Sequence, residues 1–226
     1  MRVLGMTMSK QSTFVKGALT CIAVALAATW GDANATDPAQ VVAGRQLAAK
    51  VCSACHGLDG NAPSAQFPKL AGQVPGFTAL QLRNYRSGER PSPVMAAVAK
   101  PLTDAQIEAV SSYYASLAPM QANTPADPAR VLVGEQIYQM GKPGAPACKY
   151  CHGATGDGLT PVFPRLAGQH AEFVYAALQP YQHVNDFKNP YAWVMKAVVE
   201  NLSDEDLKAV AAYVSALRPR PELAGR

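Results

Sequence analysis

The sequence contains little cysteine, no cluster of Lys and Arg and no long apolar run. Five of the 226 residues are cysteine, and 20 Lys+Arg against 16 Asp+Glu give a formal net charge of +4. So mild a balance does not favour nucleic acid as a partner. Alternating β-branched segments, which predict strands, are also lacking. These absences point away from a nucleic-acid-binding protein and from a fold built on sheets.

The first 35 residues have the pattern of a secretory signal peptide. A basic start precedes an apolar run at residues 18–28, and an Ala-x-Ala site ends at Ala35. The run is short for a membrane span, which needs about 20 residues, and a lipid anchor at Cys21 is a weaker alternative. We therefore predict that residues 1–35 are a signal peptide, cleaved after Ala35. Removing three basic residues and one acidic residue leaves 17 and 15, a net charge of +2.

The remaining chain is a tandem repeat. FPKLAGQ at residues 67–73 returns as FPRLAGQ at residues 163–169, with an offset of 96 and six of seven residues identical. VMAAV at residues 94–98 returns as VMKAV at residues 194–198, with an offset of 100. We predict two domains, residues 36–118 and 131–226, joined by a proline-rich linker at residues 119–130.

Local patterns predict helices in both domains. Apolar residues have helical spacing at residues 41–51 and 131–140. Thr103 and Gln106 form a capping box, and Ser203 opens the equivalent run with an acidic first turn. We predict an all-α fold with three to five short helices in each domain. We also expect two matched pairs of packing residues, the helix-crossing glycines Gly44 and Gly134 and the core tyrosines Tyr113 and Tyr213.

Each half carries one C-x-x-C-H motif. The motif consists of Cys52, Cys55 and His56 in the first half and of Cys148, Cys151 and His152 in the second. Such a motif can be a redox dithiol, half of a zinc site or a haem attachment site, and the histidine directly after it is typical of c-type haem. Two thiols at this spacing can form thioethers with two vinyl groups of a porphyrin, which places the adjacent imidazole at the iron.

The two rival interpretations of the motif fit the chain less well. Cys55 and Cys148 are separated by 92 residues, whereas four-cysteine zinc sites close over about 15–20 residues. A redox dithiol is typical of a βαβ setting, which the helical patterns do not offer. We predict two covalently bound haem c groups, with the four cysteines as attachment points and His56 and His152 as ligands of the two irons.

Prolines and methionines repeat together with the motif. Pro68 and Pro164 each follow the motif histidine by 12 residues, and we predict that their carbonyls accept a hydrogen bond from His56 and His152. Met95 and Met195 are the methionines that match in the repeat, and we predict that they complete the coordination of the two irons. Two rival ligands, His170 and His183, have no counterpart in the first half, so we expect them at the surface.

Together these motifs resemble two class I cytochrome c domains in tandem and are similar to the dihaem cytochrome c4 family, over about residues 39–219. The resemblance implies a periplasmic carrier that shuttles single electrons from a quinol-oxidising complex to a terminal oxidase. It implies redox proteins as partners, without a small-molecule substrate, and it is compatible with peripheral association with the membrane. The alternative is the dihaem cytochrome subunit of a sulfide or thiosulfate dehydrogenase. Insertions at residues 142–147 and ahead of Met195 make the surroundings of the second haem different.

The predicted coordination also favours a carrier over an enzyme. An iron with a histidine on one side and a methionine on the other has no free position for substrate, so we expect no catalytic residues. The two halves differ in charge, since residues 36–125 have seven basic and five acidic residues and residues 126–226 have ten of each. We expect the halves to dock different partners, with the N-terminal half preferring the more acidic surface.

Overall fold

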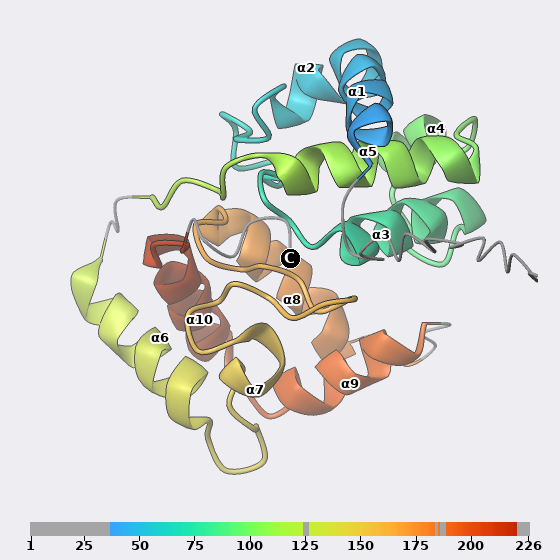
Figure 1. The fold of residues 1–226 in the computed structure, drawn as a ribbon. Helices are drawn as coiled ribbons and strands as arrows, with labels where there is room; N and C mark the ends of the chain where they lie inside the picture. The colour runs from blue at the N-terminus through green and yellow to red at the C-terminus, as the bar shows by residue number, and fades with distance from the viewer. Residues whose placement is uncertain (1–36, 124–126, 184, 186–188, 221–226) are drawn as a thin grey trace, which may run out of the picture. The chain divides into compact units, whose positions relative to one another are not determined.

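The computed structural model describes residues 37–123, 127–183, 185 and 189–220. The predicted signal peptide and its cleavage site lie outside these residues. Within the described ranges the regular structure is helical and no strand occurs, apart from two isolated bridges, so the predicted all-α class is confirmed (Figure 1). None of the helices in this part of the chain has the length and hydropathy that a membrane span requires.

The first half contains five described α-helices and one π-helical turn. They are α1 (Pro38–Leu47), the π-helical turn η1 (Ala48–Cys52), α2 (Ser53–His56), α3 (Pro75–Ser87), α4 (Pro93–Ala99) and α5 (Asp104–Ser116). The helix predicted at residues 41–51 begins earlier, because the Asp37 carboxylate caps the N-terminus of α1. The predicted capping box is present at α5, where the side chains of Thr103 and Gln106 each accept from the other's backbone N–H.

The second half repeats this order in its described residues. Its helices are α6 (Pro128–Met140), α7 (Lys149–His152), α8 (Ala171–His183), α9 (Pro190–Val199) and α10 (Asp204–Ala216). Asp127 caps α6, so this helix begins inside the segment that the sequence assigns to the linker. Ser203 and Asp206 form a full capping box at α10. In place of the π-helical turn, an extra loop with a Lys142–Ala145 bridge leads from α6 to α7.

The first and last helices of each half cross closely (Figure 1). They make contact as α1 with α5 and as α6 with α10. The predicted crossing glycines lie at these contacts: a Cβ at Gly44 would lie 2.0 Å from the Ala109 carbonyl oxygen, and one at Gly134 would lie 2.0 Å from that of Ala209. No side chain fits at either position, which confirms the role predicted for both glycines.

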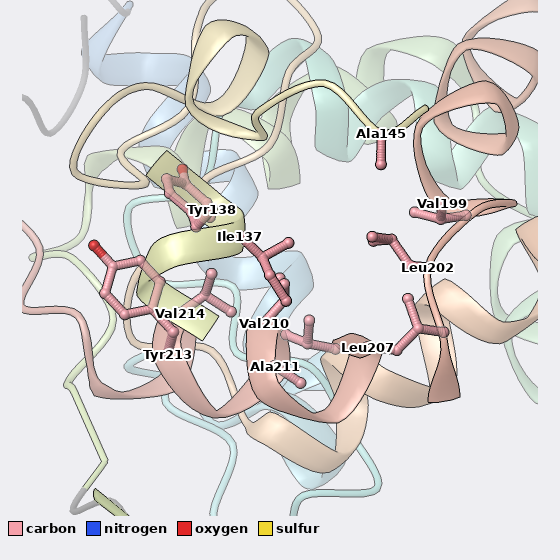
Figure 2. Packing of buried hydrophobic residues seen from close by; sticks show 11 residues of the cluster. Ile137, Tyr138, Ala145, Val199, Leu202, Leu207, Val210, Ala211, Tyr213 and Val214 are labelled. Atoms are coloured by element: carbon pink, nitrogen blue, oxygen red, sulfur yellow. The ribbon is translucent and has the colours of Figure 1, made fainter. Parts of the chain in front are cut away.

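The apolar core of the second half forms around its crossing. Figure 2 shows Ile137 and Tyr138 of α6 facing Val210, Tyr213 and Val214 of α10. The rings of Tyr138 and Tyr213 are 5.3 Å apart between centroids. In the first half, Tyr113 packs in the equivalent buried cluster. Both predicted core tyrosines are therefore in the core.

Candidate haem sites

The two C-x-x-C-H motifs form short helical turns directly beside the crossing helices. The first follows the π-helical turn without a break, and the second follows the extra loop after α6. All four motif cysteines are free and partly buried, and no disulfide joins them. No group of three or more metal-binding His, Cys, Asp or Glu side chains gathers in the described part of the chain. The thiols are therefore available for attachment.

Each motif histidine is held by the carbonyl of the proline that lies 12 residues later. Nδ1 of His56 lies 2.9 Å from the Pro68 carbonyl oxygen, and Nδ1 of His152 lies 3.0 Å from that of Pro164. A carbonyl can only accept, so Nδ1 must carry the proton and donate it. Nε2 is then the nitrogen with a free lone pair. This is the arrangement in which a metal-bound histidine is fixed by its other ring nitrogen.

The other ring nitrogen of His152 is free to bind a metal. Nε2 of His152 is buried and has no hydrogen-bond partner among the described residues, and a buried polar atom without a partner needs an explanation. Burial lowers the pKa of both His56 and His152, although the bond to the proline carbonyl acts in the opposite direction. Both rings are thus kept neutral, which is the form that binds iron.

The turn after each histidine is anchored by a tyrosine hydroxyl that the sequence analysis missed. In the first half Tyr114 of α5 donates to the Gly57 carbonyl at 3.2 Å, and in the second half Tyr138 of α6 donates to the matching Gly153 carbonyl at 2.7 Å. The two tyrosines come from different helices, so they do not align in the repeat. One sequence signal exists, an exchange of large and small residues between matched positions: Ala48 matches Tyr138, and Tyr114 matches Val214. In the structure Ala48 packs in one cluster with Tyr114, and Val214 packs in one cluster with Tyr138.

The predicted methionine ligands occupy matching positions in α4 and α9. Met95 and Met195 are both half-buried, and Met195 packs against the core of the second half. The two unmatched methionines differ from them and from each other, since Met140 is 75% exposed and Met120 is fully buried. The position of Met95 is set by the N-cap of α4, where its backbone N–H donates to the Ser92 hydroxyl at 3.3 Å.

One of the two histidines expected at the surface makes a contact with the other half of the chain. His183 is exposed at the end of α8, as expected. His170 is half-buried, and its Nε2 lies 2.8 Å from the Ala62 carbonyl oxygen in the first half of the chain. His170 is therefore only partly at the surface, and its contact with Ala62, 108 residues away in sequence, has no sign in the repeat.

A buried cation follows each proline that holds a motif histidine: Lys69 follows Pro68, and Arg165 follows Pro164. The partners of this cation differ between the halves. Lys69 Nζ donates to three neutral oxygens: the Gln121 carbonyl at 2.6 Å, the Asn123 amide oxygen at 2.9 Å and the Gly168 carbonyl at 3.0 Å. Arg165 instead pairs with the buried Asp157 carboxylate at 2.8 Å. Burial lowers the pKa of Lys69. The electrostatic surroundings of the two sites are therefore unequal.

Two helical domains, each with an attachment turn whose histidine is held through Nδ1, define a dihaem c-type cytochrome. The Cytochrome c family profile matches residues 41–118 and 131–218. The chain belongs to the cytochrome c family, in its dihaem cytochrome c4 group, and it carries two covalently bound haem c groups.

The relatives and solved structures agree with this assignment. Cytochrome c4 of Pseudomonas aeruginosa is 34% identical, with 86% of this chain and 97% of the relative covered. A thiosulfate dehydrogenase electron acceptor of Thiomonas intermedia is 35% identical, with 73% and 77% covered. The crystal structure of reduced recombinant cytochrome c4 from Pseudomonas stutzeri is 34% identical and has a TM-score of 0.71, with 79% of this chain and 98% of that chain covered. The protein is thus an electron-transfer cytochrome.

Proposed function

We propose that the protein is an exported, periplasmic electron carrier that shuttles single electrons from a quinol-oxidising complex to a terminal oxidase. The observation that carries this proposal is the histidine–proline contact, which occurs at 2.9 Å in the first half and at 3.0 Å in the second. Two histidines whose Nδ1 atoms bond to a proline carbonyl in the same way support two sites of the same kind. The predicted signal peptide supports the location outside the cytoplasm.

The residues of each half have separate tasks in the proposed sites. Cys52 and Cys55 hold one haem, and Cys148 and Cys151 hold the other. His56 and Met95 ligate the first iron, and His152 and Met195 ligate the second. When bound, haem supplies a one-electron ferric/ferrous couple, whose potential is raised by a methionine ligand. The carbonyls of Pro68 and Pro164 fix the ring orientation and make the imidazole a better donor to the metal.

The methionine assignment is tested by substitution with a matched control. Met95→Ala and Met195→Ala should each remove the methionine–iron absorption band of one haem and lower the potential of that haem. Met140→Ala should leave both haems unchanged, since this side chain is 75% exposed. If both methionine bands persist in the first two variants, the proposed ligands are wrong.

Carbon monoxide distinguishes a carrier from an enzyme. With both axial positions filled by protein side chains, the reduced protein should not bind carbon monoxide at neutral pH. Met195→Ala, which opens one position, is the positive control and should bind one equivalent. Ready binding by the unmodified protein at one haem would contradict a pure carrier function and favour a catalytic site.

The similarity to thiosulfate dehydrogenase electron acceptors supports a second candidate function. In that case the protein would accept electrons from a thiosulfate-oxidising enzyme. Stopped-flow reduction by a quinol-oxidising complex and by a thiosulfate dehydrogenase, at equal concentrations, separates the two candidates. Faster reduction by the quinol-oxidising complex, followed by oxidation by a terminal oxidase, is expected. The opposite order would replace the first proposal with the second.

The charge difference between the halves bears on docking. The N-terminal half carries a net +2 and the C-terminal half a net charge of zero. If the halves dock different partners, the rates of reduction and of oxidation should depend differently on ionic strength, because surface charges are screened within about 8–10 Å in salt. Equal salt dependence of the two rates would contradict separate docking sites.

A further inference from the structure

The repeated segments FPKLAGQ and FPRLAGQ end in Gln73 and Gln169, and each of these glutamines contacts the other half of the chain. The side-chain oxygen of Gln73 accepts the backbone N–H of Arg165 at 2.7 Å, and its amide nitrogen donates to the Arg165 carbonyl at 2.9 Å. Gln169 makes the same two bonds with the backbone of Lys69, both at 2.9 Å. Both glutamines are buried. The contact is reciprocal, so the two halves exchange identical hydrogen bonds.

The orientation of each glutamine amide is determined by its partners. The Gln73 oxygen also accepts the N–H of Val74 at 2.9 Å, and the Gln169 oxygen accepts that of His170 at 3.0 Å. Two N–H donors meet at each oxygen, so a flipped amide would place donor against donor. The oxygen therefore faces the backbone N–H of Arg165 or Lys69, as described.

The peptide that each glutamine grips is the same peptide that holds the haem histidine of the opposite half. The Pro164–Arg165 peptide accepts from His152 through its carbonyl and donates to Gln73 through its N–H. The Pro68–Lys69 peptide accepts from His56 and donates to Gln169 in the same way. A chain of two hydrogen bonds across one peptide group thus links each histidine to a glutamine of the other half.

We infer that Gln73 and Gln169 are crossed positioning residues: Gln73 sets the donor strength of His152, and Gln169 sets that of His56. The inference rests on the proposed ligation of iron by these histidines. Through these bonds the reduction potential of each haem depends on a residue of the opposite domain. The family motifs within one domain do not contain this information, because the partners lie 92 and 100 residues apart.

The direction of the effect follows from hydrogen-bond polarisation. An N–H that donates to an acceptor makes the carbonyl of the same peptide a stronger acceptor, since hydrogen bonds in a chain reinforce one another by about 10–30%. A stronger acceptor draws the Nδ1 proton from the histidine and makes the ring a better electron donor to iron. A better donor favours ferric iron. Loss of the glutamine should therefore raise the potential of the haem in the opposite half.

The experiment compares Gln73→Leu and Gln169→Leu in the full-length protein with both haems attached. A redox titration followed by NMR reports each haem separately through its own methyl resonances. In Gln73→Leu, the ferrous-to-ferric ratio of the C-terminal haem at a fixed solution potential should rise about threefold, which is about 28 mV at 59 mV per tenfold. The N-terminal haem should change far less. Gln169→Leu should show the reverse pattern.

Two controls separate positioning from loosening of the contact between the halves. His170→Ala removes a different contact between them, the 2.8 Å bond to the Ala62 carbonyl, and should leave the potentials unchanged. Gln73→Glu keeps an acceptor for the Arg165 N–H and also serves if Gln73→Leu does not fold. In Gln73→Glu the potential of the C-terminal haem should equal or fall below that of the unmodified protein.

Several results would overturn the inference. They are a shift in the haem of the same half, equal shifts in both haems, no shift, a rise in Gln73→Glu, or the same shift in His170→Ala. Failure of the underlying site assignment has a different signature. The optical spectrum of the unmodified protein would then lack histidine–methionine coordination at one haem or both, whatever the glutamine variants show.

Discussion

The crossing of α6 and α10 should not tolerate a single added methyl group. In Gly134→Ala the new Cβ would lie 2.0 Å from the Ala209 carbonyl oxygen and 2.8 Å from the Cβ of Tyr213. Carbon–oxygen contacts normally lie at about 3.3–3.6 Å, so the oxygen must retreat by about 1.3 Å. Because it belongs to the backbone of α10, no change of rotamer can move it. The two helices must separate along the crossing.

The expected cost follows from two opposing effects. Overpacking of a tight core costs about 1–3 kcal/mol, and a clash of backbone against side chain belongs at the upper end. Alanine in a helix interior is more favourable than glycine by about 1 kcal/mol. We therefore expect a net loss of about 2 kcal/mol in the free energy of unfolding. Separation should also lengthen the 3.1 Å bond that the Gln139 side-chain nitrogen of α6 donates to the Tyr213 hydroxyl of α10.

The measurement is denaturant unfolding of the oxidised protein with its haems attached. Helix content reports the fold, and haem absorbance reports each site, since the two domains need not unfold together. Val133→Ala is the matched control, because this neighbouring side chain is 50% exposed and its loss should change stability by about 0.5 kcal/mol or less. An unfolding midpoint of Gly134→Ala equal to that of the unmodified protein would refute the reasoning.

Three further outcomes are expected in the second half. Tyr138→Phe should lose about 1 kcal/mol of unfolding free energy, measured by the same denaturant titration; an unchanged midpoint would show that the bond to Gly153 is dispensable. Asp157→Asn should lose about 3 kcal/mol, since it leaves the buried Arg165 without its carboxylate; equal midpoints at pH 7 would contradict this. Burial alone would raise the pKa of Asp157, but hydrogen bonds from Thr155 and Arg220 and the charge of Arg165 outweigh it and hold the pKa below the ordinary 3.8. The stabilisation by Asp157 should thus be complete well above pH 4 and lost as the pH falls through the lowered pKa. The difference in unfolding free energy between Asp157→Asn and the unmodified protein should therefore shrink in acid, and a constant difference would contradict this.

Much of the haem chemistry could be predicted from the sequence, because the groups concerned are neighbours along the chain. Two thiols and an imidazole within five residues have only a few chemical uses, and a following histidine leaves haem as the best one. The proline 12 residues later could be matched to its histidine because the spacing recurs in both halves. Helix starts at Thr103 and Ser203 were equally accessible, since a capping box is a local pattern.

The tyrosine that anchors each haem turn cannot be found by matching identical residues between the two halves. The hydroxyl that anchors the haem turn comes from Tyr114 in one half and from Tyr138 in the other. A large residue on one helix requires a small one opposite, and either arrangement fills the crossing. Alignment of the two halves pairs Tyr138 with Ala48 and Tyr114 with Val214, so the shared function is visible only once the helices are in contact.

By itself the sequence predicted the chemistry of this protein: two haems, the cysteines proposed to attach them, and a helical fold whose repeat matches motif to motif. Those conclusions depend on residues close together in the chain, whose geometry is limited by covalent distance. The tertiary structure alone decided how the halves meet, including the exchange of Gln73 and Gln169 and the contact between His170 and Ala62. Those partners are 92 to 108 residues apart, and only folding brings them within hydrogen-bond distance.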